Sequence, residues 1–105
     1  MIVEQRTYTL YPGKVPEYIK HYTELGYAIQ CEVLGPPVGW YYSEIGTINQ
    51  IVHMWMYEDL EDRARRRAAQ AAHPGWPKYL EKITPLLMRQ ESQILLPAKF
   101  FTPKR

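Results

Sequence analysis

The segment Gln50-Ile51-Val52-His53-Met54-Trp55-Met56-Tyr57 has the pattern of a central β-strand whose two faces differ in chemistry. Successive side chains of a strand point to opposite faces. One face therefore carries Val52, Met54 and Met56, and the other carries Ile51, His53, Trp55 and Tyr57. Smooth aliphatic side chains suit packing against helices. We therefore expect the first face to meet the helices and the aromatic, polar-tipped face to point away from them.

Three further strands are expected around this segment. Residues 2–11 are rich in β-forming residues and end at Tyr11-Pro12-Gly13, a turn signal. Residues 38–44 form a hairpin with residues 50–57 through a short loop at 45–49. The last strand covers about Leu87 to Leu96, and residues 97–105 look irregular.

Helices are expected between these strands. Apolar residues recur at helical spacing from Val15 to Leu25, and this helix either ends at Gly26 or continues to about Val33. A second helix runs from about Asp59, a plausible N-cap, to Ala72. A short third helix covers Pro77 to Thr84.

The resulting order, β-α-β-β-α-(α)-β, predicts an α+β fold. Right-handed crossovers convert it into one four-stranded antiparallel sheet with strand order 4-1-3-2 and helices on one face. This is the ferredoxin-like β-α-β-β-α-β plait.

Composition excludes several classes of protein. A chain of 105 residues is one domain, 1–105, and its net charge of +2 does not indicate nucleic acid or an anionic membrane as a partner. The single cysteine, Cys31, excludes a disulfide framework and a multi-cysteine zinc site. The longest stretch without Asp, Glu, Lys or Arg, Ile45 to Tyr57, is shorter than the about 20 residues that span a bilayer. Without a signal peptide at residues 1–10, a cytoplasmic protein is expected.

Aromatic residues, 13% of the chain, predict a partner subunit. If the aromatic face points away from the helices, five rings of about 150–250 Å² each would expose roughly 1,000 Å². The largest apolar patch of a monomer is about 300–600 Å². We therefore predict a homodimer that packs sheet on sheet about a two-fold axis.

The same face predicts a small-molecule site. Aromatic walls with buried polar tips are typical of a cavity lining. Candidate catalytic residues are His53, as a general base, and Glu44, which would orient it. Candidate ligand-binding residues are Glu4, Arg6, Tyr8, Trp40, Tyr42 and Trp55.

Each of these residues also has a structural interpretation. His53 could be a hydrogen-bonded interface histidine, Glu44 a solvated carboxylate, and Glu4 and Arg6 a structural ion pair. The arginines at 63 and 65–67 are interpreted as a solvated helix face rather than a phosphate site. No metal or cofactor is expected, because the histidines fall on different elements without ligand spacing.

Several segments resemble NIPSNAP-domain proteins. They are Glu4 to Leu10 with Pro12-Gly13-Lys14, the run Gly39 to Gly46, Asn49-Gln50 with Val52 to Tyr57, the Arg- and Ala-rich stretch 60–72, and Gln90-Glu91-Ser92. The resemblance covers nearly the whole chain. It implies the dimeric α/β-barrel group, in which two ferredoxin-like units join their sheets, and whose members include cofactor-free monooxygenases, isomerases and haem-handling enzymes. It implies no established reaction.

Two functional hypotheses follow. In the first, a homodimeric barrel binds an apolar or aromatic metabolite and, as an enzyme, performs cofactor-free proton transfer or oxygen chemistry, with Arg6 or Tyr8 steadying negative charge. In the second, the protein is a non-catalytic scaffold or interaction module whose aromatic residues fill a dry core. Haem binding is a distant third.

Overall fold

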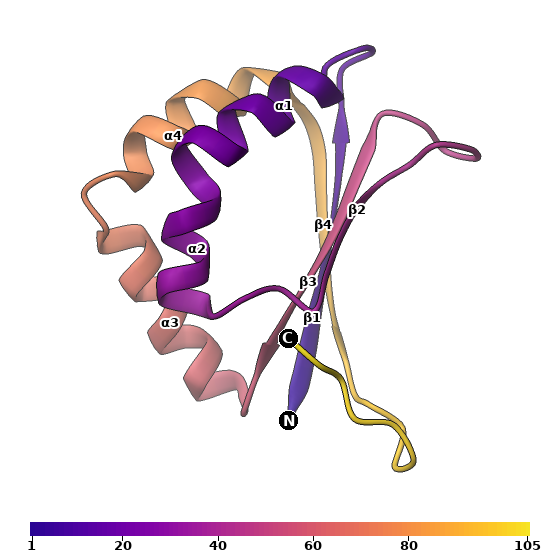
Figure 1. The fold of residues 1–105 in the computed structure, drawn as a ribbon, viewed down its shortest axis with the longest axis vertical. Coiled ribbons are helices and arrows are strands. Elements are labelled where there is room, and N and C mark those ends of the chain that lie inside the picture. The colour runs from indigo at the N-terminus through magenta and orange to yellow at the C-terminus, as the bar shows by residue number, and fades with distance from the viewer.

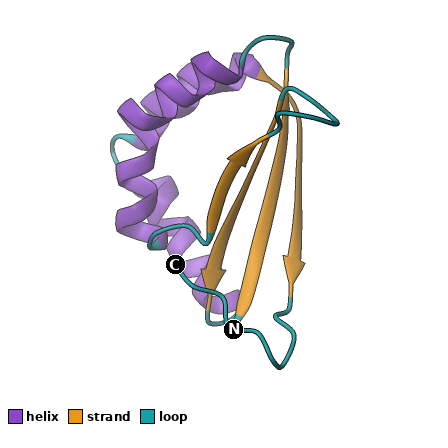
Figure 2. Ribbon diagram, turned by 45° about the vertical axis from the view of Figure 1, so that its right-hand side comes forward, coloured by secondary structure: helices purple, strands orange, loops and turns teal.

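The computed structural model describes all 105 residues, which form a sheet with a layer of helices on one face (Figure 1). Figure 2 shows the helices arching over that face, while the opposite face of the sheet is open. The elements, in chain order, are β1 (Ile2–Leu10), α1 (Val15–His21), a π-helical segment (Tyr22–Gly26), α2 (Tyr27–Leu34), β2 (Gly39–Tyr42), β3 (Gln50–Tyr57), α3 (Leu60–Ala72), α4 (Trp76–Ile83), a 3₁₀ turn (Thr84–Leu86) and β4 (Leu87–Leu95).

The sheet has the predicted topology. All its pairs are antiparallel and its strand order is β2-β3-β1-β4. Arg6 of β1 lies opposite His53 of β3 on one side and Ser92 of β4 on the other. His53 in turn lies opposite Trp40 of β2. The register therefore aligns chemically distinct residues of four strands in one row across the sheet.

The first helix continues past Gly26, which settles the alternative that the sequence left open. The chain passes from α1 through the π-helical segment into α2 without a break. A Cβ atom at Gly26 would lie 2.8 Å from the ring of Tyr79, so glycine allows α4 to approach the helix closely. π-helical insertions of this kind are frequent at functional sites.

The predicted cap of α3 is confirmed. The Asp59 carboxylate accepts a hydrogen bond from the backbone N–H of Asp62 at 2.7 Å, which satisfies one of the free amides at the helix start. The Asp62 carboxylate in turn accepts from Arg66 Nε at 2.8 Å. This pairing one turn along stabilises the same end of the helix.

The prediction of which face of β3 meets the helices was wrong. Ile51, Trp55 and Tyr57 are fully buried beneath the protein's own helices, and His53 is 2% exposed. The alternate residues of β3, Val52, Met54 and Met56, are only half-buried and lie on the open face.

The reason for this orientation is the width of the space to be filled. The helices arch over the sheet and contribute three large rings, those of Tyr18, Tyr22 and Tyr79, to the core between the two layers. Rings from the strands interdigitate with them: Trp40 stacks on Tyr22 at 5.0 Å between centroids. Valine and methionine at these positions would leave voids, which cost stability.

The open face is uncharged along its two central strands. On β1 it presents Val3, Gln5, Thr7 and Thr9, and on β3 it presents Val52, Met54 and Met56. The C-terminal residues cover one end of it, where Pro103 is buried and Arg105 Nη2 donates to the Met56 carbonyl at 2.6 Å. Because the large aromatic rings of β3 are not on this face, the area argument for a dimer no longer holds.

No helix in this structure has the combined length and apolar character needed to span a bilayer.

Candidate functional site

A cavity of about 230 Å³ lies between the sheet and the helices. Its walls combine aromatic rings with polar side chains that come from every layer of the fold. The lining residues are Arg6, Tyr8, Tyr18, Gln30, His53, Arg67, Gln70, Trp76, Tyr79, Leu80, Ile83 and Gln90. Three of the residues predicted for a site, Arg6, Tyr8 and His53, therefore do line a cavity, but it lies inside the subunit rather than at a sheet-to-sheet interface.

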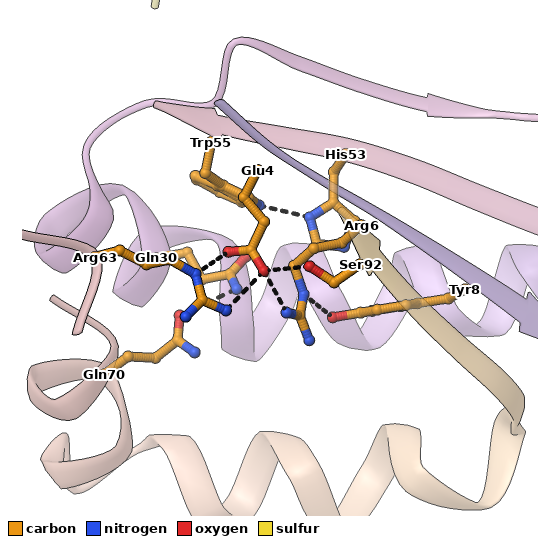
Figure 3. A network of polar contacts seen from close by, with 9 residues as sticks. All are labelled: Glu4, Arg6, Tyr8, Gln30, His53, Trp55, Arg63, Gln70 and Ser92. Carbon is orange, nitrogen blue, oxygen red and sulfur yellow. Dashed lines mark hydrogen bonds and ion pairs between the residues drawn. The ribbon is translucent and has the colours of Figure 1, made fainter. Parts of the chain in front are cut away.

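Next to the cavity, the buried carboxylate of Glu4 holds several donors in place. Arg63 of α3 donates to it from Nε at 3.0 Å and from Nη2 at 2.9 Å. Arg6 donates from Nη1 at 2.9 Å, and the Ser92 hydroxyl donates at 2.5 Å. Figure 3 shows Arg63 approaching the carboxylate on one side, with Arg6 and Ser92 on the other. Bidentate Arg–carboxylate pairing fixes both partners in position.

The donors determine the charge of Glu4. Burial alone would raise the pKa of this carboxyl, but the hydrogen bonds from Arg63 and Ser92, together with the nearby Arg6 guanidinium, outweigh it and lower the pKa to about 2. Glu4 therefore remains ionised at neutral pH. The predicted Glu4–Arg6 ion pair is present at 2.9 Å, but the stronger partner, Arg63, lies on a helix that the sequence had suggested was solvated.

Arg6 connects this carboxylate to the cavity. Its Nε donates to the Tyr8 hydroxyl at 2.9 Å. Burial would lower the pKa of Arg6, whereas Tyr8 and Glu4 raise it, and the net direction is upward. The guanidinium is therefore a permanent charge on the cavity wall.

His53 is neutral and has a defined tautomer. Trp55 Nε1 donates to His53 Nδ1 at 2.6 Å, so the proton of the neutral imidazole is on Nε2. Burial, reinforced by the charge of Arg6, lowers the pKa of His53 to about 3. The imidazole is also held between rings, stacked on Trp40 at 5.9 Å and in edge contact with Tyr8 at 4.9 Å.

The proposed catalytic pair is not supported by this geometry. A histidine with an acceptor nitrogen already occupied and a proton on the other nitrogen is a hydrogen-bond donor, not a general base. Glu44 lies exposed in the β2–β3 turn, two residues beyond the last β2–β3 pair, Tyr42 and Ile51. It is thus about 13 Å along the strand from His53, which is too far to orient the ring.

The remaining predicted residues divide between core and edge. Trp55 is a core residue whose indole orients His53. Trp40 packs between His53 and Tyr22, and its Nε1 is buried without a hydrogen-bond partner. Tyr42 is exposed at the sheet edge, where it lines a separate shallow groove of about 340 Å³ with Tyr22 and Trp40.

The structure adds residues that the sequence interpretation missed. The hydroxyls of Tyr18 and Tyr79 share a hydrogen bond of 2.7 Å, and burial raises the pKa of both phenols. A buried chain also runs from the Tyr22 hydroxyl to Gln30 at 2.6 Å and from Gln30 to Gln70 at 3.1 Å. Buried glutamines on otherwise apolar helix faces were the available signal for this chain.

The site therefore offers neutral and cationic hydrogen-bond donors in an aromatic enclosure. No group of three or more His, Cys, Asp or Glu side chains lies close enough together to hold a metal ion. The Glu4 carboxylate already accepts four hydrogen bonds, three of them on one oxygen. This chemistry favours binding and polarising a ligand over abstracting a proton from it.

The structure thus has the ferredoxin-like α+β fold, with one layer of helices and an internal cavity lined by aromatic rings. A putative antibiotic biosynthesis monooxygenase from Bacteriodes thetaiotaomicron has a similar structure, with a TM-score of 0.68 at 17% identity, over 97% of this chain and 90% of that one. This similarity concerns the fold alone.

The chain belongs to the NIPSNAP family, whose model matches residues 3–102. A NIPSNAP family protein with unknown function from Agrobacterium tumefaciens is 44% identical with a TM-score of 0.94, over 99% of this chain and 94% of that one. A NIPSNAP-like domain protein from Burkholderia xenovorans is 50% identical with a TM-score of 0.92, over 97% and 89%. The NipSnap homolog of Dictyostelium discoideum is 38% identical over 91% of this chain, which spans only 42% of that protein.

Proposed function

We propose that this NIPSNAP-family protein binds a small apolar or aromatic metabolite in the cavity between its sheet and helices. The observation that carries the proposal is the convergence of Arg6, His53 and Gln70 on an enclosure walled by aromatic rings. A few positioned polar groups in an apolar enclosure are typical of ligand sites. A cofactor-free reaction of the bound metabolite is the catalytic form of this proposal.

The size of the cavity limits the ligand. A volume of about 230 Å³ equals the space that about eight waters share in the liquid. One substituted ring fits that space, whereas a nucleotide or a haem group does not. In the competing scaffold hypothesis the same residues would form a closed core without a ligand.

Neutral benzyl alcohol is a suitable probe, observed by ligand-detected NMR. Leu80 lines the cavity and is 39% exposed, so Leu80→Trp is expected to obstruct it, whereas Leu60 lies at the start of α3 outside the cavity and Leu60→Trp serves as the matched control. We expect the wild type and Leu60→Trp to bind the probe and Leu80→Trp to lose it. If Leu80→Trp folds and binds as well as the wild type, or if the wild type binds neither benzyl alcohol nor charged molecules with the same ring, the cavity is not the site and the scaffold hypothesis is favoured.

We also propose a homodimer through the open face of the sheet. In support, β1 and β3 present no charged residue there, which is unusual for strands facing water, and such a surface can pack against a second copy of itself. Light scattering at micromolar concentration should give twice the chain mass. Thr7→Glu, on this face of β1, should dissociate the dimer, while Thr23→Glu, exposed on the first helix, should not. A monomeric wild type refutes the dimer.

A further inference from the structure

The cavity has an imbalance of charge. Two guanidinium groups, those of Arg6 and Arg67, contribute to its lining, and no aspartate or glutamate does. The nearest buried carboxylate, Glu4, is turned toward Arg63, whose fork donates to both of its oxygens. Glu4 thus neutralises the charge of Arg63 and part of the charge of Arg6, so the cavity wall keeps a net positive charge.

Arg67 has no counterion in the protein. It is half-buried on α3, and no carboxylate lies within ion-pair distance of it. Its neighbours on the helix differ in this respect, because Arg65 and Arg66 both pair with Asp62. Partly buried guanidinium groups are normally paired, since desolvating an isolated charge is costly.

Arg6 also retains unused donors. A guanidinium carries five N–H groups, and Arg6 uses one for Tyr8 and one for Glu4. In Figure 3 its guanidinium lies on the helix side of β1. The remaining N–H groups are available to an acceptor in the cavity.

Neutral donors complete the arrangement. The His53 imidazole holds its proton on Nε2, since Nδ1 accepts from Trp55. In the Tyr18–Tyr79 pair, the phenol that accepts the shared hydrogen bond keeps its own proton for another acceptor. The polar side chains of the cavity are therefore richer in donors than in acceptors.

We infer that the ligand of this cavity is an anion: a planar, apolar molecule with one carboxylate or comparable oxyanion, bound by Arg67 and by the free edge of Arg6. The inference rests on the proposed function and specifies its ligand class. The anionic group lies toward the guanidinium groups, and the ring lies against Trp76, Tyr79 and Ile83, which form the apolar wall. The anionic group of the ligand supplies the counterion that Arg67 lacks within the protein.

The test compares probes that share a ring and differ in charge: benzoate, neutral benzyl alcohol and cationic benzylammonium, each titrated by calorimetry. Charge-assisted hydrogen bonds to a desolvated guanidinium predict that benzoate binds about 10- to 100-fold more tightly than benzyl alcohol. Benzylammonium should bind least. Equal affinity for benzoate and benzyl alcohol overturns the anion assignment but leaves the proposed function intact, whereas failure of all three probes overturns both.

The Arg67→Gln variant locates the effect. It should lower benzoate affinity about 10-fold or more and change benzyl alcohol affinity less than about twofold. Arg65→Gln is the matched control, because it removes the same charge from the same helix at a side chain that is 70% exposed. If both variants weaken benzoate equally, the preference comes from the general field of the helix and the assignment to Arg67 is wrong.

Discussion

Replacing Glu4 by glutamine tests the central network most directly. The substitution keeps the size of the side chain and removes its charge, leaving Arg6 and Arg63 close together without their shared counterion. Glu4 is fully buried and accepts hydrogen bonds from three residues. Breaking a buried ion pair on one side costs about 3–5 kcal/mol, so we expect the free energy of unfolding at pH 7 to fall by that amount.

Urea unfolding measures this loss. With a denaturant slope of about 1–3 kcal/mol/M for a small domain, the midpoint should move by roughly 2 M. Glu17→Gln is the matched control, because Glu17 is exposed on α1, away from the sheet, and forms ion pairs only with Lys14 and His21 at the surface. The control should lose less than about 1 kcal/mol.

The pH dependence gives an independent check. The pKa of Glu4 falls from 4.5 to about 2 on folding, so its contribution is fully present above pH 4.5 and is lost as the pH falls toward 2. At about 1.4 kcal/mol per pKa unit this contribution is about 3 kcal/mol. The wild type should therefore lose its advantage over Glu4→Gln across that range. Equal losses in Glu4→Gln and Glu17→Gln at pH 7, or an advantage independent of pH, would refute the reasoning.

Three further predictions concern the core: a contrast between two tyrosine variants, a glycine substitution and the protonation of His53. Tyr57→Phe removes a buried hydroxyl without a hydrogen-bond partner and should raise the free energy of unfolding by about 1–3 kcal/mol, whereas Tyr18→Phe removes the hydrogen bond to Tyr79 and should lower it by about 1 kcal/mol. Thermal unfolding should therefore show opposite shifts for the two variants. A loss of stability in Tyr57→Phe would contradict the assignment of an unpartnered hydroxyl. Gly26→Ala places a Cβ 2.8 Å from the Tyr79 ring and should destabilise by about 1–3 kcal/mol, with exposed Thr23→Ala as the control; equal stability would show that α4 can shift. In a variant with His21→Asn and His73→Asn, ¹⁵N NMR should show His53 protonated on Nε2 and unchanged from pH 8 to pH 5, because its pKa lies at about 3; titration near neutral pH would restore the general-base hypothesis.

Topology could be predicted from the sequence because its signals are local. The hairpin spacing, the run of β-forming residues at 50–57 and the Asp59 cap each identify an element by itself, and right-handed crossovers then leave one strand order. Boundaries differ by a few residues, as in β2, which covers only Gly39–Tyr42.

The orientation of the sheet could not be predicted in the same way. Both faces of β3 are apolar, so alternation separates the two sets but does not say which one meets the helices. The deciding quantity is the gap between layers, which depends on residues distant in sequence, such as Tyr22 and Tyr79. Aromatic residues on the inner faces of the helices were the signal that matched the aromatic face of the strand.

The sequence predicted several residues of the site but not where the site lies or which side chains contact one another. Glu4, Arg6, Tyr8 and His53 do gather, because they share one face of adjacent central strands. Arg63, which pairs with Glu4, and Arg67, which lines the cavity, could not be recognised among neighbouring arginines, since the helix position relative to the sheet determines which guanidinium points inward.

The connections of Glu4 set the order in which the molecule can assemble. Its strand, β1, precedes the donors Arg63 and Ser92 in the sequence, because Arg63 lies on α3 and Ser92 lies on β4, 88 residues beyond Glu4 along the chain. Until β4 has been synthesised, β1 lacks one neighbouring strand and its carboxylate lacks a donor. The network around Glu4 can therefore close only after contacts between residues distant in sequence have formed, and such contacts carry a large loop-closure cost.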